Sequence, residues 1–208
     1  MAGDLKIASA QFENASRDKS YNLAKIKKMA HDAAGRGCQV AAFHECSITG
    51  YSFARHTSRD ELLAIAEPVP TGPSVQMLMD ISRETRTLIL ASLFEREEDQ
   101  ETGDTKIYNT YICVDGTRLL GRFRKLHPFI SKHLSVGNEY VVLDILGWKC
   151  GILICYGNNI VENVRATALL GAEIIIMLHV AMCTVSTRPG VGFVDPALWK
   201  NRERIRHR

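Results

Sequence analysis

Short, mostly apolar runs set between helical patterns constrain the fold of this chain more than any other feature. The runs occupy residues 40–43, 87–94, 148–154 and 172–178. Such runs are typical of strands buried on both faces of a sheet that helices cover. Helical spacing marks residues 21–36 and 74–86, the second beginning at Ser74 as its N-cap, and a further helix is expected over 160–170. This order predicts an α/β fold rather than an all-β fold.

A hairpin is the clearest local pattern in the sequence. Strand-like residues 107–114 and 119–124 flank Asp115 and Gly116, and an Asp-Gly pair supplies the positive φ that a tight turn needs. The charged stretch 95–106 before it is expected to be a loop.

Composition excludes several classes of protein. The 208 residues, 46% hydrophobic and 24% charged, suit one globular domain over 1–208. No apolar run approaches the ~20 residues that span a bilayer, and the first residues lack the pattern of a signal peptide, so we expect a cytoplasmic protein with no membrane partner. The net charge of +3 arises from a basic segment over 200–208, which is typical of a solvated helix face, so we expect no nucleic-acid partner. The six cysteines show no metal-ligand spacing, which predicts free thiols, no metal and no cofactor.

Three reactive side chains each stand at the end of a predicted strand. They are Glu45, Lys125 and Cys155. Functional sites in open α/β sheets gather at the carboxyl ends of strands. Taken singly, Glu45 is most simply a surface carboxylate, Lys125 a solvated charge, and Cys155 a small buried hydrophobe. Taken together, they supply the groups that acyl transfer needs.

A cysteine at the junction of a strand and a helix, in front of backbone N–H groups, is suited to nucleophilic attack. A lysine ~4 Å from a thiol lowers its pKa, so we expect Lys125 to make Cys155 mostly a thiolate at neutral pH. Glu45 would then act as a general base toward the thiol and later toward water, and Lys125 would stabilise the oxyanion of a tetrahedral intermediate.

The segments around these residues resemble the nitrilase superfamily of carbon–nitrogen hydrolases. They read Phe-His-Glu-Cys-Ser-Ile-Thr-Gly-Tyr at Glu45, Phe-Arg-Lys-Leu-His at Lys125, and Gly-Ile-Leu-Ile-Cys-Tyr at Cys155. Further matching segments are residues 8–12, 108–110 and 165–174. The resemblance implies an α-β-β-α sandwich, a Glu-Lys-Cys triad of these three residues, and a homodimer or larger homo-oligomer.

The resemblance also implies an amidase-like activity on a small-molecule substrate. A non-peptide carbon–nitrogen bond, of an amide or carbamoyl compound rather than a nitrile, would be hydrolysed through a thioester on Cys155 with release of ammonia or an amine. The backbone N–H of Tyr156 would join Lys125 in binding the oxyanion. The expected substrate-pocket residues are Tyr51, Phe53, His133 and His179.

Three features depart from the family pattern. Gly157 stands where an acidic residue is common, and the loop after Lys125 lacks a glutamate that many members carry, with Glu139 the nearest acid. The family normally continues past a segment like 196–203 with further strands. We therefore expect a C-terminally truncated member, with an incomplete sandwich and a strand over 174–178 that lacks a neighbour.

Two other interpretations stay open. A catalytically inactive truncated relative would act as a binding or oligomer-forming module. Alternatively, a cysteine–histidine hydrolase would pair Cys155 with His127 or His179.

Overall fold

The structure is a computed structural model that describes residues 3–100 and 102–180. The elements are β1 (Ile7–Ala10), α1 (Lys19–Gly35), β2 (Val40–Phe43), the 3₁₀ turn η1 (Ser52–His56), α2 (Arg59–Ile65), α3 (Pro73–Thr85), β3 (Leu88–Glu98), β4 (Thr105–Val114), β5 (Leu119–Arg124), β6 (Val142–Ile145), β7 (Trp148–Ile154), the 3₁₀ turn η2 (Cys155–Asn159), α4 (Val161–Leu169) and β8 (Ile174–Leu178). All four apolar runs that were predicted as buried strands form strands.

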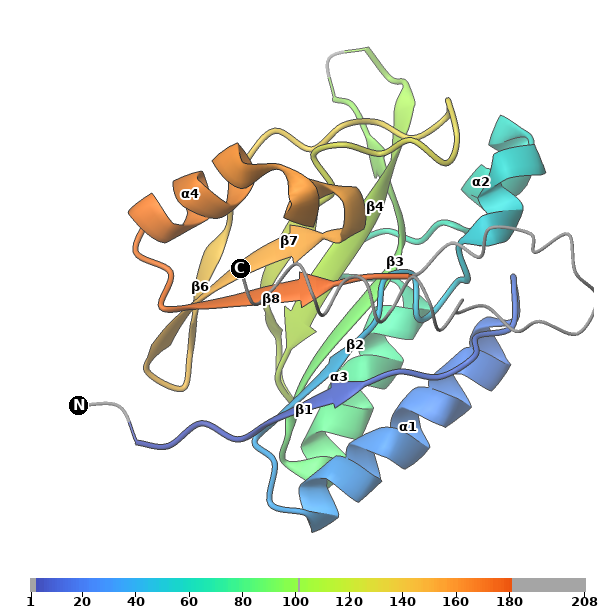
Figure 1. Cartoon of the computed structure of the whole chain (residues 1–208). Helices are drawn as coiled ribbons and strands as arrows, with labels where there is room; N and C mark the ends of the chain where they lie inside the picture. The colour runs from blue at the N-terminus through green and yellow to red at the C-terminus, as the bar shows by residue number, and fades with distance from the viewer. Residues whose placement is uncertain (1–2, 101, 181–208) are drawn as a thin grey trace, which may run out of the picture.

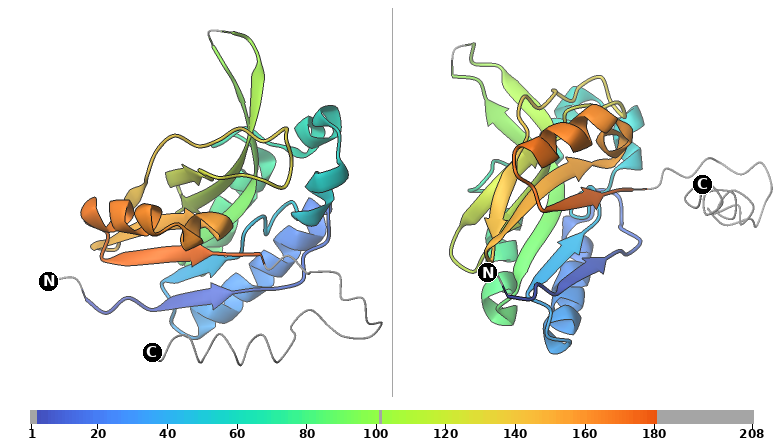
Figure 2. Two further views of the ribbon diagram at one scale, coloured as in Figure 1. Left: turned by 45° about the horizontal axis from the view of Figure 1, so that its top comes forward. Right: turned by 60° about the vertical axis from the view of Figure 1, so that its left-hand side comes forward.

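Two sheets stack face to face between two layers of helices. The first has the strand order β1-β2-β3-β4-β5, and the second has the order β6-β7-β8. Helices α1 and α3 lie on one side of the stacked sheets and α4 lies on the opposite side (Figures 1 and 2). This arrangement confirms the predicted α-β-β-α sandwich.

The apolar runs of β2 and β3 are buried on both faces because each of these strands contributes to two cores, whereas β8 is mostly half-buried and Met177 is 45% exposed, against the prediction of a buried strand. In β2, Ala41 and Phe43 pack in the core beneath α1 and α3, whereas Val40 points to the core between the two sheets. In β3, Ile89 packs in the core beneath the helices and Leu90 packs in the core between the sheets. Successive side chains of a strand point to opposite faces, so a strand with a layer on each side must be apolar at every position.

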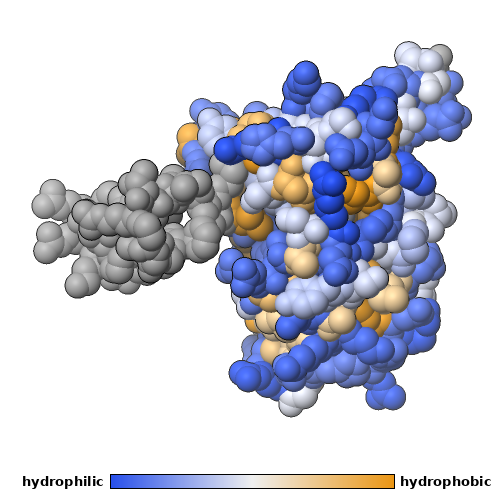
Figure 3. All heavy atoms as spheres, turned by 90° about the vertical axis from the view of Figure 1, so that its right-hand side faces the viewer, coloured by the Kyte–Doolittle hydropathy of each residue, from blue (hydrophilic) through white to orange (hydrophobic). Residues whose placement is uncertain are grey.

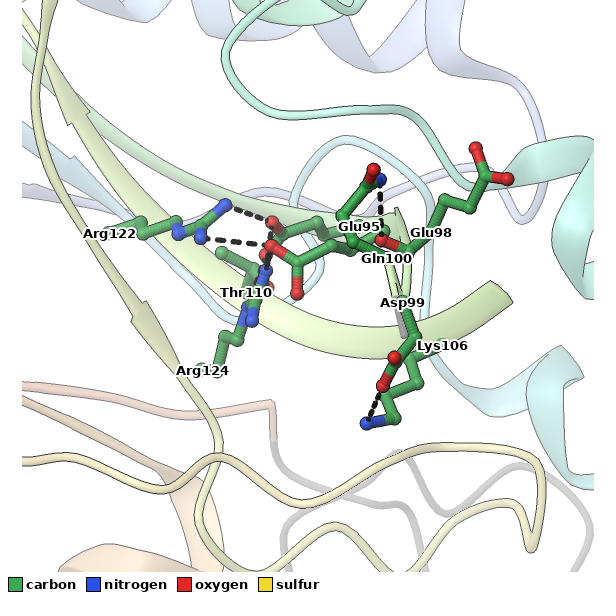
Figure 4. A network of polar contacts seen from close by, with 9 residues as sticks. Glu95, Glu98, Asp99, Gln100, Lys106, Thr110, Arg122 and Arg124 are labelled. Carbon is green, nitrogen blue, oxygen red and sulfur yellow. Dashed lines mark hydrogen bonds and ion pairs between the residues drawn. The ribbon is translucent and has the colours of Figure 1, made fainter. Parts of the chain in front are cut away.

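Half of the stretch that was expected to be a charged loop is strand. β3 continues to Glu98 and β4 begins at Thr105, and Glu95 within β3 is fully buried. Figure 4 shows Arg122 and Arg124 reaching the Glu95 carboxylate, and Arg124 Nη2 lies 2.6 Å from it. The charge of Glu95 in β3 is therefore neutralised by arginines of β5, the next strand but one in the sheet, which a local sequence pattern cannot reveal.

Helix α3 begins one residue earlier than predicted, and Ser74 is not its N-cap. Gly72 occupies the N-cap position and has no side chain to accept a hydrogen bond. Glu67 takes that part from outside the helix, because its carboxylate accepts hydrogen bonds from the Ser74 N–H and Oγ, both at 2.8 Å. An acceptor at this end also complements the positive pole of the helix dipole.

The turn between β4 and β5 also differs from the prediction. Gly116 does not have a positive φ. The Asp115 carboxylate holds the turn instead, by accepting the N–H groups of Thr117 and Arg118 at 2.7 and 2.9 Å. Gly116 lets the turn lie close to the backbone of Arg83 in α3, because a Cβ at this position would lie only 2.9 Å from that backbone.

The surface of the described part is polar for the most part. On the face in Figure 3, hydrophilic side chains cover most of the area and apolar atoms appear in small separate patches. None of the helices within residues 3–100 and 102–180 is both long enough and apolar enough to cross a membrane. Strand β8 pairs with β7 and forms an edge of the second sheet as far as the structure describes it.

Gly137→Ala should lower the free energy of unfolding by about 1–3 kcal/mol, because an added Cβ would lie 2.2 Å from the carbonyl oxygen of Arg124 and the backbone would have to move. Urea unfolding measures the change. Gly35→Ala is the control, since nothing lies within 4 Å of its Cβ position in α1, and its stability should be unchanged or higher. Equal stability of the two variants would contradict the prediction.

Candidate active site

The three predicted reactive residues lie together, each just beyond a strand. Glu45 follows β2, Lys125 follows β5 and Cys155 follows β7. Their exposed fractions are 0%, 1% and 4%. Lys125 Nζ lies 2.7 Å from Glu45 Oε1, and the Cys155 thiol lies close enough to the Glu45 carboxylate for its charge to raise the pKa of the thiol. The site is therefore a buried ion pair with a thiol against it.

Glu45 is held by more than its lysine. Its Oε1 also accepts a hydrogen bond from Asn109 Nδ2 at 2.8 Å, and its Oε2 meets the N–H of Val180 at 3.4 Å. Ser92 Oγ fixes Asn109 by donating to its Oδ1 at 3.3 Å. We gave Asn109 no role from sequence, although an amide in the middle of the otherwise apolar and aromatic strand β4 was a signal.

Two aromatic rings enclose the lysine. Lys125 Nζ lies 5.3 Å from the ring centroid of Tyr51 and 5.2 Å from that of Phe129. Both contacts are favourable for a cation and keep water from the ammonium group. The Lys125 charge is thereby directed at Glu45 and at any negative charge that develops beside it.

Cys155 has a strained backbone that neighbouring side chains support. Its φ is 52°, a left-handed value that costs a residue other than glycine about 1–2 kcal/mol. Asn163 Nδ2 donates to the Gly157 carbonyl at 3.1 Å, and Tyr140 Oη donates to Asn163 Oδ1 at 2.9 Å. The side-chain amide of Asn163 therefore holds the turn at Gly157. At this position an acidic residue is common in the nitrilase superfamily, which the chain resembles.

The expectation that Lys125 makes Cys155 a thiolate is wrong. Burial raises the pKa of the Cys155 thiol to about 11, and the charge of Glu45 raises it further than Lys125 lowers it. The ammonium group is committed to Glu45, so its effect on the thiol is largely cancelled. At neutral pH the thiol keeps its proton, and attack requires a base in contact with it.

Of the four expected pocket residues, only Tyr51 is in contact with one of the three clustered residues. Tyr51 is buried beside Lys125, whereas Phe53 packs into the apolar cluster behind Tyr51. His133 is half-buried in the loop after β5, and His179 is exposed beyond β8. Neither histidine hydrogen-bonds to the three clustered residues in the part of the chain that the structure describes.

An open groove lies beside Tyr156. Its lining residues are Leu126, His127, Pro128, Phe129, Val136 and Tyr156. Phe129 links the groove to Lys125, and His127 meets the Tyr156 ring edge-on at 6.4 Å. His127 is thus part of the groove wall, while the carboxylate whose charge acts on the Cys155 thiol is that of Glu45.

The remaining cysteines and acids form no further centre in the described ranges. The free cysteines there are 38, 46, 113, 150 and 155, and Cys183 lies outside those ranges. Among the same residues, no group of three or more potential ligands could hold a metal ion.

Comparison with known proteins identifies the family. The sequence profile described as "Carbon-nitrogen hydrolase" matches residues 6–192. The chain belongs to this family. Among similar carbon-nitrogen hydrolases, a nitrilase from Pyrococcus abyssi is 29% identical over 174 residues, which are 82% of this chain and 63% of that protein. An (R)-stereoselective amidase from Pseudomonas sp is 26% identical, with 84% and 60% covered.

Solved structures of this family share the fold. The amidase from Nesterenkonia sp. AN1 in complex with butyramide superposes with a TM-score of 0.69 at 22% identity, and the match covers 84% of this chain and 65% of that one. The chain therefore spans less than two thirds of the length of the carbon-nitrogen hydrolases to which it is compared here.

Alkylation of Cys155 by iodoacetamide should increase with pH up to a midpoint near 11, well above that of N-acetylcysteine, because only the thiolate reacts and the pKa is raised to about 11. In Glu45→Gln the midpoint should fall, because the negative charge that raises the pKa is gone while Lys125 remains. Mass spectrometry of the Cys155 peptide measures both. A wild-type midpoint at or below that of N-acetylcysteine would show that the thiol is not held protonated.

Proposed function

We propose that this chain hydrolyses a non-peptide carbon–nitrogen bond of a small amide or carbamoyl compound through a thioester on Cys155. The observation that carries the proposal is the buried Glu45 carboxylate, fixed by Lys125 and in contact with a thiol of raised pKa. A neutral thiol next to a fixed base suits proton transfer coupled to attack.

In the first half-reaction, Glu45 accepts the proton of the Cys155 thiol while Sγ attacks the carbonyl carbon. The carbonyl oxygen becomes an oxyanion, which Lys125 and the backbone N–H of Tyr156 stabilise. Glu45 returns the proton to the nitrogen, the carbon–nitrogen bond breaks, and ammonia or an amine leaves. The acyl group stays on sulfur as a thioester.

In the second half-reaction, water replaces the departed nitrogen. Glu45 accepts a proton from the water as its oxygen attacks the thioester carbon, and Lys125 again stabilises the oxyanion. The carbon–sulfur bond breaks, the thiol recovers its proton from Glu45, and the acid is released. The cycle needs no group besides these side chains and water.

The relative from Pyrococcus abyssi is named a nitrilase, but most of the other relatives and the solved structures are named amidases, which supports an amide or carbamoyl substrate over a nitrile. Besides the stereoselective amidase, they include an omega-amidase from Xenopus laevis and an N-carbamoylputrescine amidase from Arabidopsis thaliana. Another structure of the Nesterenkonia amidase bears the acetamide moiety of fluoroacetamide on its active-site cysteine. The groove beside Tyr156 would receive the acyl part of the substrate, because its wall is mostly apolar.

We also propose that the chain forms a homodimer or larger homo-oligomer through α4. Val161 and Leu169 are 69% and 77% exposed on this helix, and Leu170 just after it is 58% exposed. Analytical ultracentrifugation should give at least a dimer mass, and Leu169→Lys should shift the chain toward monomer, since the interface would bury an unpaired charge. A variant as oligomeric as the wild type would exclude α4 as the interface.

The cytoplasmic location stays a prediction.

Cys155→Ala should lower ammonia release from small amides by about 10³-fold or more, because the nucleophile is removed, and should leave the circular dichroism spectrum unchanged. Cys38→Ala is the matched control and should keep the wild-type rate. Full activity of the Cys155 variant would refute the mechanism. If the wild type released no ammonia from any amide, the interpretation as an inactive binding module would replace the proposal.

A further inference from the structure

A buried hydroxyl without a partner lies next to the candidate active site. Tyr51 is 2% exposed, and its Oη has no hydrogen-bond partner within residues 3–100 and 102–180. A buried polar group in this state is destabilising, and buried hydroxyls normally find a partner. The fully buried Tyr111 does so, since its Oη donates to the carbonyl of Phe43 at 2.9 Å. The unpaired Tyr51 hydroxyl therefore requires an explanation.

The surroundings of Tyr51 connect it to the catalytic groups. Its ring lies 5.3 Å from Lys125 Nζ. Burial and, after it, the nearby charge of Glu45 hold the pKa of its phenol well above the usual value. The hydroxyl therefore keeps its proton at all ordinary pH values. It can donate one hydrogen bond and accept others, and the ring that carries it packs against Lys125 of the candidate active site.

We propose that the Tyr51 hydroxyl forms a hydrogen bond with the carboxamide group of the bound substrate. This inference rests on the proposed function, since it assigns Tyr51 to the same site. A carboxamide brings both donors and an acceptor into a site that excludes water, and each of them needs a partner there. Lys125 is committed to Glu45 and to the oxyanion, so it can satisfy only the oxygen. The Tyr51 hydroxyl can hydrogen-bond to either the nitrogen or the oxygen of the carboxamide. It would therefore favour an amide over a compound that has no carboxamide group.

Stability gives the first test. Tyr51→Phe removes an unpaired buried hydroxyl, so its melting temperature should equal or exceed that of the wild type. Tyr111→Phe is the matched control, because the same change there takes away the donor of the Phe43 carbonyl and should lower the melting temperature. A lower melting temperature for Tyr51→Phe would show that the hydroxyl already has a structural partner, and the proposal would fall.

Labelling of Cys155 gives the second test and requires no turnover. Iodoacetamide carries a carboxamide, whereas methyl methanethiosulfonate modifies thiols without one. Tyr51→Phe should slow labelling by iodoacetamide about 10-fold, the factor expected for one lost hydrogen bond, and leave labelling by methyl methanethiosulfonate within about twofold. Tyr111→Phe should change neither rate. Mass spectrometry of the Cys155 peptide measures each rate.

The outcomes separate this inference from the proposed function. The role proposed for Tyr51 would be overturned if Tyr51→Phe left the rate of iodoacetamide labelling unchanged. It would also be overturned if the rates with both reagents fell equally, because Tyr51 would then act on the thiol itself. If the reagent difference holds while the wild type hydrolyses no amide, the proposed hydrolysis fails and the role of Tyr51 stands. If amides are hydrolysed equally well by Tyr51→Phe and the wild type, the proposed function stands and the role of Tyr51 fails.

Discussion

The ion pair between Lys125 and Glu45 is the interaction on which the rest of the site depends. Its two charges come from the ends of β5 and β2, 80 residues apart, and both side chains are almost completely buried. Removing either partner would leave an uncompensated charge inside the protein, which costs about 3–5 kcal/mol. The pair is tolerated because Asn109 supplies a further donor to the carboxylate and because two rings face the ammonium group. The first sheet must therefore form in its observed register before the pair can exist, which couples the active-site geometry to the fold.

The same pair affects the protonation state of the Cys155 thiol. A lysine with no partner would stabilise a thiolate, but Lys125 already neutralises Glu45, and burial then keeps Cys155 protonated. A protonated thiol reacts slowly with adventitious electrophiles and gains nucleophilicity when a base removes its proton. Glu45 Oε1 is occupied by Lys125 and Asn109, whereas Oε2 makes one long contact, with Val180, among the described residues. The proton of the thiol thus has an acceptor with free lone pairs.

Sequence reasoning succeeded where the signal was local and failed where it depended on distant partners. Strand-end placement together with the family resemblance selected Glu45, Lys125 and Cys155, which lie together in the structure while their catalytic roles stay a prediction. The short apolar runs located the strands. The loop predicted around Glu95 was wrong because two arginines of β5, distant in the chain, neutralise that buried carboxylate. The effect of Lys125 on the thiol was misjudged because Lys125 was considered against Cys155 alone, whereas its charge is neutralised by Glu45. Asn109 was missed because the register of β3 and β4 decides what its amide meets.

Two unfavourable features of the site have one physical origin. Cys155 has a left-handed φ, and Tyr51 buries a hydroxyl without a partner among the described residues, so each lowers the stability of the free protein. Such features persist when the surroundings determine them completely, as the contacts of Asn163 do for the turn after β7. A local conflict with folding rules is expected where groups are reserved for a ligand. The strained φ belongs to the residue whose thiol lies near Glu45, and the ring that carries the unpaired hydroxyl lies 5.3 Å from the lysine that would bind the oxyanion. Both therefore act on the small volume around Cys155 in which the chemistry would take place.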